Sequence, residues 1–182
     1  METTEKYVAF LRGINVGGHH KVPMADLRLE LEKLNFKNIV TLLNSGNIIF
    51  ESNDNNLENK ISGHLEKSFG FPVPTVIRKS ANINDLLIKN PFKDVKITKD
   101  IRLYVSFLRK NHGTELNLPW GSADNSFEIV EKMDETIFSI LDLSVSKTPK
   151  AMEALEKFYG KDMTTRNWNT IERIGEKIKA SH

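Results

Sequence analysis

The sequence predicts an α+β protein in which a ferredoxin-like βαββαβ subdomain is followed by a smaller α+β subdomain that ends in two helices. Two observations predict this fold. Residues 7–11 are apolar on both faces, as in a central covered strand, and residues 101–107 alternate apolar and polar, as in a strand with one buried face. We therefore expect subdomains at 1–79 and 101–182, joined by a helix and linker at 80–100.

The first helix and the hairpin after it are predicted from their turn residues. Pro23 suits the first turn of a helix over 24–34, because the N–H that proline lacks has no intrahelical partner there. Asn44-Ser45-Gly46 has a tight-turn composition. It predicts a hairpin between the β-prone runs 39–43 and 47–50.

A second helix and a fourth strand complete the βαββαβ order. A capping box from Asn55 to Glu58 predicts the start of the helix, and Gly70 predicts its end. The strand over 73–78 contains Pro74, which cannot donate to a ladder and is tolerated at a sheet edge. The ferredoxin-like order 4-1-3-2 places the fourth strand at an edge, so the proline supports this topology.

The second subdomain is predicted from alternation and from helix caps. A short helix from Ser80 stops before Pro91 and leads into a polar connection. After it we expect, in chain order, a strand at 101–107, a loop at 111–125, a hairpin from 127–130 to 137–140, a helix from Thr148 to Gly160, and a last helix whose apolar face includes Trp168.

Composition excludes several kinds of site. The chain has no cysteine, so it offers neither disulfides nor a thiolate zinc site, and a reducing compartment is favoured. No apolar run is long enough for a signal sequence or a membrane span, which predicts a cytoplasmic protein with no membrane partner. Residues 1–78 hold nine basic and nine acidic side chains, so nucleic acid is possible but not favoured as a partner.

A glycine-rich loop over 12–18 is the first candidate site. The loop follows an apolar strand, contains three glycines and comes before a helical pattern. In this arrangement backbone N–H groups can point at an anion. Right-handed crossover topology places this loop and the turn at 44–47 on the same rim of the sheet. For the turn at 44–47 alone we prefer a structural role. For His19 and His20, which follow the glycine-rich loop, we expect solvated loop positions and no metal.

A polar stretch over 164–170 is the second candidate. Thr164 or Thr165 can cap the last helix, which would leave Arg166 and Asn167 in its first turn, where the helix dipole favours an anion. The structural alternatives are a surface ion pair for the arginine and a capping role for the asparagine. The candidate ligand-binding residues are Arg12, Gly13, Asn15, Gly17, Gly18, Lys21, Ser45, Asn47, Lys147, Thr165, Arg166 and Asn167.

These motifs closely resemble the bacterial family called domain of unknown function 1697, over nearly the full chain. The resemblance rests on residues 10–18, Pro23-Met24, Ser45-Gly46-Asn47 and 164–170. It implies a two-subdomain α+β protein and names neither a reaction nor a cofactor. Ser146-Lys147 resembles a further motif of the family, which is why Lys147 is a candidate.

Three functions follow from these observations. The leading hypothesis is binding of a small phosphate- or carboxylate-bearing ligand, such as a nucleotide, between the two subdomains. The alternatives are an RNA-binding module of RRM topology, with Tyr7 or Phe50 on its sheet face, and an enzyme of unidentified reaction class. The oligomeric state stays open, because either residues 101–182 or a second subunit could cover the second face of 7–11.

Overall fold

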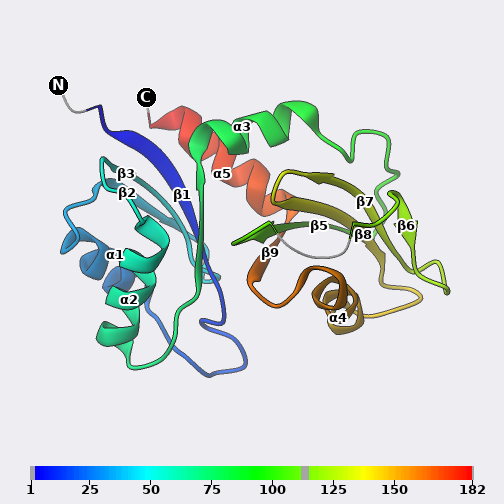
Figure 1. The fold of residues 1–182 in the computed structure, drawn as a ribbon, viewed down its shortest axis with the longest axis horizontal. Helices are drawn as coiled ribbons and strands as arrows, with labels where there is room; N and C mark the ends of the chain where they lie inside the picture. The colour runs from blue at the N-terminus through cyan, green and yellow to red at the C-terminus, as the bar shows by residue number, and fades with distance from the viewer. Residues whose placement is uncertain (1–2, 112–114, 182) are drawn as a thin grey trace. The chain divides into compact units, whose positions relative to one another are not determined.

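The computed structural model describes residues 3–111 and 115–181 (Figure 1). In these residues the chain is a mixed α+β protein with two antiparallel sheets and five helices. It divides into two compact units, the first comprising Met1–Asp85 with Ile174–His182 and the second comprising Leu86–Arg173. The subdomain boundaries drawn from the sequence, 1–79 and 101–182, stay a prediction.

The first unit contains a four-stranded sheet with order β2-β3-β1-β4. This is the strand order expected from the sequence, and β4 lies at an edge. The edge strand begins directly after Pro74, whose carbonyl accepts a hydrogen bond from the Arg12 N–H at 2.9 Å. The elements are β1 (Glu5–Leu11), α1 (Met24–Glu32), β2 (Lys37–Leu42), β3 (Asn47–Ser52), α2 (Leu57–Phe69), β4 (Thr75–Lys79) and the start of α3 (Ser80–Lys89), which belongs to the second unit from Leu86 on.

Both faces of β1 are buried, as its apolar sequence predicts. Ala9 and Leu11 belong to the core on the side of α1 and α2, which Figure 1 shows on one face of the sheet. Val8 and Phe10, which point to the other face, are completely buried within the single chain. The C-terminal segment belongs to this unit, and Lys6 Nζ donates to the Ser181 carbonyl at 3.2 Å. Burial of this face therefore does not require a second subunit.

The capping box predicted for α2 is wrong. Asn56, in the left-handed conformation, is the residue before the helix, and no side chain caps it. Glu58 Oε1 instead accepts a hydrogen bond from the Ile77 N–H of β4 at 3.0 Å. The carboxylate thus accepts a hydrogen bond from an N–H group of the edge strand. This contact between two elements cannot be seen from the spacing of residues within the helix. Gly70 ends the helix in the left-handed conformation, as predicted.

The second unit is built on a five-stranded sheet with order β6-β7-β8-β5-β9. Two of its strands were not predicted: β6 lies inside the expected loop at 111–125, and β9 begins at Met163 and includes the first half of the second polar stretch. The helix after Thr148 packs on one face of the sheet, and Gly160 ends it as expected. The elements are β5 (Ile101–Leu108), β6 (Trp120–Gly121), β7 (Phe127–Met133), β8 (Thr136–Asp142), α4 (Thr148–Tyr159), β9 (Met163–Asn167) and the start of α5 (Trp168–Ala180), which belongs to the first unit from Ile174 on.

Candidate functional site

The glycine-rich loop and the β2–β3 turn lie on the same rim of the first sheet, as predicted. Asn15 joins them through its side chain, because Nδ2 donates to the Val22 carbonyl at 3.0 Å and to the Asn44 carbonyl at 2.8 Å. Its Oδ1 accepts from the Val22 N–H at 2.8 Å. The carboxamide of Asn15 therefore holds the rim together, and both of its N–H donors are occupied.

The glycines of this loop shape a turn. Gly17 and Gly18 have φ of 59° and 76°, and the His19 N–H donates to the Val16 carbonyl at 3.0 Å across them. Two consecutive positive φ angles are typical of the tightest hairpin turns, which explains the glycines. The helix α1 begins at Met24 after Pro23, as predicted, so the glycines precede the helix and form a turn of their own. The binding of an anion by this loop stays a prediction.

The turn before β3 is determined by close packing. A Cβ at Gly46 would lie 2.8 Å from Ile14 Cδ1 and 2.9 Å from Leu11 Cβ, and φ is +80°. Asn47 is completely buried, and its Nδ2 donates to the Leu42 carbonyl at 2.9 Å and to Ser45 Oγ at 3.0 Å. These contacts support a structural role for residues 44–47, and ligand binding by Ser45 and Asn47 stays a prediction.

The second polar stretch forms a strand before it forms a helix. Arg166 pairs with Val105 in the β5–β9 ladder and is 8% exposed, so its predicted position in the first turn of α5 is wrong. Its guanidinium donates to Thr164 Oγ1 at 2.7 Å and to the Thr165 carbonyl at 3.0 Å. Burial lowers the pKa of Arg166 to about 10. Thr165 does not cap the helix, since its hydroxyl lies 2.7 Å from Ser106 Oγ on β5.

The remaining predicted residues lie apart along the chain. Gly13 precedes the turn, and its carbonyl lies 3.1 Å from the Nδ1 atom of His20, whose ring stacks on Phe71 at 4.3 Å. Lys21 is exposed, and Lys147 is the exposed residue directly before α4. Arg12 belongs to the first unit and Arg166 to the second, so their joint site stays a prediction.

The sheet face that an RRM uses for RNA is not exposed in this chain. Tyr7 and Phe50, the aromatic residues expected there, lie on the opposite, helix-covered face and stack with centroids 5.7 Å apart. The residues that do point to the RRM-type face, Val8, Phe10 and Ile49, are at most 1% exposed. An RNA-binding sheet needs aromatic rings open to bases, so this arrangement disfavours the RNA hypothesis.

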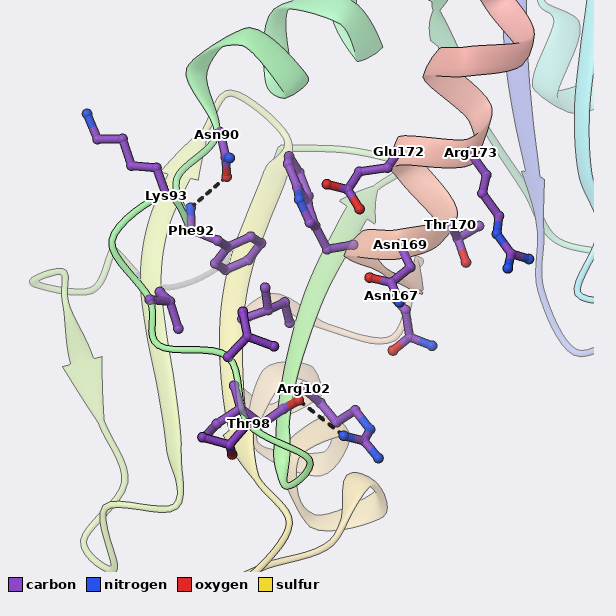
Figure 2. Close-up of a pocket in the computed structure, with 15 residues that line it drawn as sticks. Asn90, Phe92, Lys93, Thr98, Arg102, Asn167, Asn169, Thr170, Glu172 and Arg173 are labelled. Atoms are coloured by element: carbon purple, nitrogen blue, oxygen red, sulfur yellow. Dashed lines mark hydrogen bonds between the residues drawn. The ribbon is translucent and has the colours of Figure 1, made fainter.

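A cavity of about 620 Å³ lies within the second unit where α5 begins (Figure 2). Three segments build it: the stretch after α3, the first residues of β5, and the junction of β9 with α5. Its lining residues are Asn90, Phe92, Lys93, Val95, Ile97, Thr98, Ile101, Arg102, Leu103, Asn167, Trp168, Asn169, Thr170, Glu172 and Arg173.

Two aromatic residues of the lining, Phe92 and Trp168, belong to a buried cluster. Phe92 and Trp168 are 4% and 5% exposed, and their rings meet edge to face with centroids 5.3 Å apart. Phe138 of β8 packs against both rings. The prediction that Trp168 belongs to the core is therefore confirmed, and the cluster holds the start of α5 against the sheet.

The polar lining of the cavity carries more positive than negative charge. Lys93, Arg102 and Arg173 contribute cations, whereas Glu172 is the carboxylate among the lining residues. One guanidinium nitrogen of Arg102 donates to the carbonyls of Lys99 and Ile101 at 2.8 and 3.1 Å, which restrains this side chain. An anion is the ligand class that such a lining favours.

Sequence reasoning found only part of this lining. Asn167 is the one candidate residue that lines the cavity, although the motif at 164–170 also contains Asn169 and Thr170, which do so too. Lys93, Arg102 and Arg173 were missed. Arg173 carries a usable signal, because it lies four residues after Asn169 and so shares its face of α5. Lys93 and Arg102 carry none, since only the fold brings their segments together.

The described part of the chain contains no cluster of three or more metal-ligating side chains. Within residues 3–111 and 115–181, no helix combines the length and the apolar character that crossing a bilayer requires.

Comparisons with known proteins indicate the fold and the family. No curated protein is significantly similar to the chain. A solved structure, described as that of the conserved bacterial protein SP0830 from Streptococcus pneumoniae, is similar with a TM-score of 0.70 and 24% sequence identity. The match covers 96% of this chain and 98% of that one, and at this identity it supports the fold alone. Residues 4–138 match the model of the family described as Protein of unknown function (DUF1697), and the chain belongs to that family.

Proposed function

We propose that this protein binds a small ligand carrying a phosphate or a carboxylate, in the cavity where α5 begins. The observation that carries the proposal is the charge of the lining, in which Lys93, Arg102 and Arg173 stand against Glu172. Guanidinium groups bind carboxylates and phosphates with paired, charge-assisted hydrogen bonds. Asn167, Asn169 and Thr170 add neutral side chains that can donate hydrogen bonds.

The size of the cavity and the position of α5 agree with this ligand class. A volume of about 620 Å³ lies in the range of roughly 300–1,000 Å³ that is typical of small-molecule sites. The helix has 13 residues, and the N–H groups of its first turn have no intrahelical acceptors. Its dipole therefore adds to the attraction that the arginines exert on an anion.

A titration with inorganic phosphate and with AMP, followed by two-dimensional NMR and thermal unfolding, tests the proposal. We expect saturable shifts of the backbone signals of residues 167–173 and a rise in melting temperature. Arg173→Gln and Arg102→Gln should each weaken binding at least fivefold. The matched control is Arg28→Gln, because Arg28 is an exposed arginine of α1 outside the cavity, paired with Glu32. Binding that both cavity variants leave unchanged would exclude this site.

The site predicted from the sequence is a wider version of the same proposal. It places the ligand between the subdomains, with Arg12, the glycine loop, Lys147 and Arg166 as further contacts. In the same titration, Arg12→Gln and Arg166→Gln test this version directly.

We also propose that residues 1–79 form a ferredoxin-like subdomain, supported by the strand order β2-β3-β1-β4. We further propose that the protein works in the cytoplasm, supported by its lack of cysteine.

A further inference from the structure

We infer that the ligand of this cavity is amphipathic, with an anionic group held by the start of α5 and a hydrocarbon body lying against the segment 90–103. The inference rests on the proposed function and adds the chemical class of the ligand. It follows from the unequal distribution of polar and apolar groups over the lining.

Five of the nine polar side chains of the lining lie at the start of α5, and the other four, Asn90, Lys93, Thr98 and Arg102, belong to the segment 90–103 together with most of the apolar ones. Figure 2 shows Asn167, Asn169, Thr170 and Arg173 together on one side of the cavity. The segment that carries Phe92, Lys93 and Thr98 lies on the other side. A bare phosphate or acetate ion would therefore use one side of the cavity and leave the other in contact with water.

The apolar groups come from the other two segments. Val95, Ile97, Ile101 and Leu103 line the cavity, and Ile97 is 63% exposed. When a ligand covers such an exposed aliphatic side chain, apolar surface is removed from water and the free energy of the complex is lowered. Its position beside a cationic lining distinguishes it from Ile88, which is 83% exposed but lies outside the cavity.

The shape of the apolar side favours a hydrocarbon over a stacked base. The rings of Phe92 and Trp168 are buried against each other and against Phe138, so they do not present an open face. The ligand meets branched aliphatic side chains instead. Such a surface recognises an acyl, alkyl or ring hydrocarbon by its size, without the planar contacts that select a nucleobase.

A series of carboxylates of increasing length tests the inference, with affinities measured by calorimetry and NMR. The probes are acetate, butanoate, hexanoate and octanoate, with hexanamide as the neutral analogue of hexanoate. We expect the affinity to rise by up to about fourfold for each added CH₂ until the apolar side is covered. Hexanamide should bind at least tenfold more weakly than hexanoate.

Two variants separate the body of the ligand from its anion. Ile97→Asn should weaken hexanoate at least fivefold and leave acetate and inorganic phosphate unchanged, whereas Arg173→Gln should weaken all three. Ile88→Asn is the matched control, since it makes the same change at an exposed isoleucine outside the cavity. Both isoleucine variants alter exposed side chains, and thermal unfolding checks that they keep the fold.

The outcomes distinguish failure of the inference from failure of the proposed function. If phosphate and acetate bind but hexanoate binds no better, the inference is wrong and the proposed function stands. If hexanamide binds as well as hexanoate, the cavity binds the hydrocarbon chain without selecting for a negative charge, and the anion proposal fails. If no probe shifts the signals of residues 167–173, both proposals fail.

Discussion

Two polar regions of this chain look alike in sequence and differ in what their side chains do. The first is the rim of the first sheet, formed by residues 12–22 and 43–47. The second is the cavity at the start of α5. At the rim, Asn15 and Asn47 direct their amides to backbone carbonyls of the same unit. At the cavity, Asn167 and Asn169 line a space large enough for a ligand.

Asparagine and glycine content alone therefore does not identify a binding site. Both residue types stabilise tight turns, because glycine tolerates positive φ and asparagine bonds to nearby backbone. A polar side chain becomes a candidate for binding when the fold leaves it facing a cavity. Substitutions at the rim should therefore change protein stability more than substitutions at the cavity.

The largest effect is expected from Gly46→Ala at the rim. The new Cβ would lie within 3 Å of Ile14 and Leu11, and alanine disfavours the φ of +80° found there. We expect a loss of about 3 kcal/mol in the free energy of unfolding, measured by urea titration. Gly63→Ala is the control, since this helical glycine has open space around its Cβ position and should gain up to ~1 kcal/mol. Equal effects at the two positions would contradict the packing argument.

The next effect contrasts two asparagines. Asn15→Gly keeps a residue suited to the φ of 55° and removes three side-chain hydrogen bonds, so we expect a loss of about 2 kcal/mol in stability. Asn167→Ala changes an exposed side chain of the cavity and should alter stability by less than ~0.5 kcal/mol while weakening anion binding. An equal loss in the free energy of unfolding for Asn167→Ala and Asn15→Gly would contradict the view that only Asn15 has a structural role.

The smallest effect concerns backbone strain at the rim. Leu43 has a φ of 58°, a conformation that bulky residues rarely adopt, and its side chain is 43% exposed. Leu43→Asn should therefore raise the free energy of unfolding by roughly 0.5–1 kcal/mol, because asparagine tolerates this conformation. The same change at Leu29, an exposed helical residue of α1, should lower stability slightly. A loss of stability at position 43 would show that the leucine side chain matters more than the strain.

Several features of the fold could be predicted because their causes are local. The hairpin at 44–47, the helix end at Gly70 and the edge position of β4 follow from residues next to one another in the chain. The apolar face of α5 placed Trp168 in the core correctly.

The family match spans 4–138, so it does not include the stretch 164–173 from which one side of the cavity is built.

The hairpin turn at 44–47, the helix start after Pro23 and the burial of both faces of β1 can be predicted from the chain alone. Periodicity and turn chemistry act over a few residues, and so they are visible in the chain. The burial of Arg166 in a strand depends on long-range pairing, because β9 forms against β5, about 60 residues earlier in the chain. Only the tertiary structure brings Lys93, Arg102 and Arg173 to one cavity, since their segments meet through packing and not through any pattern that each contains.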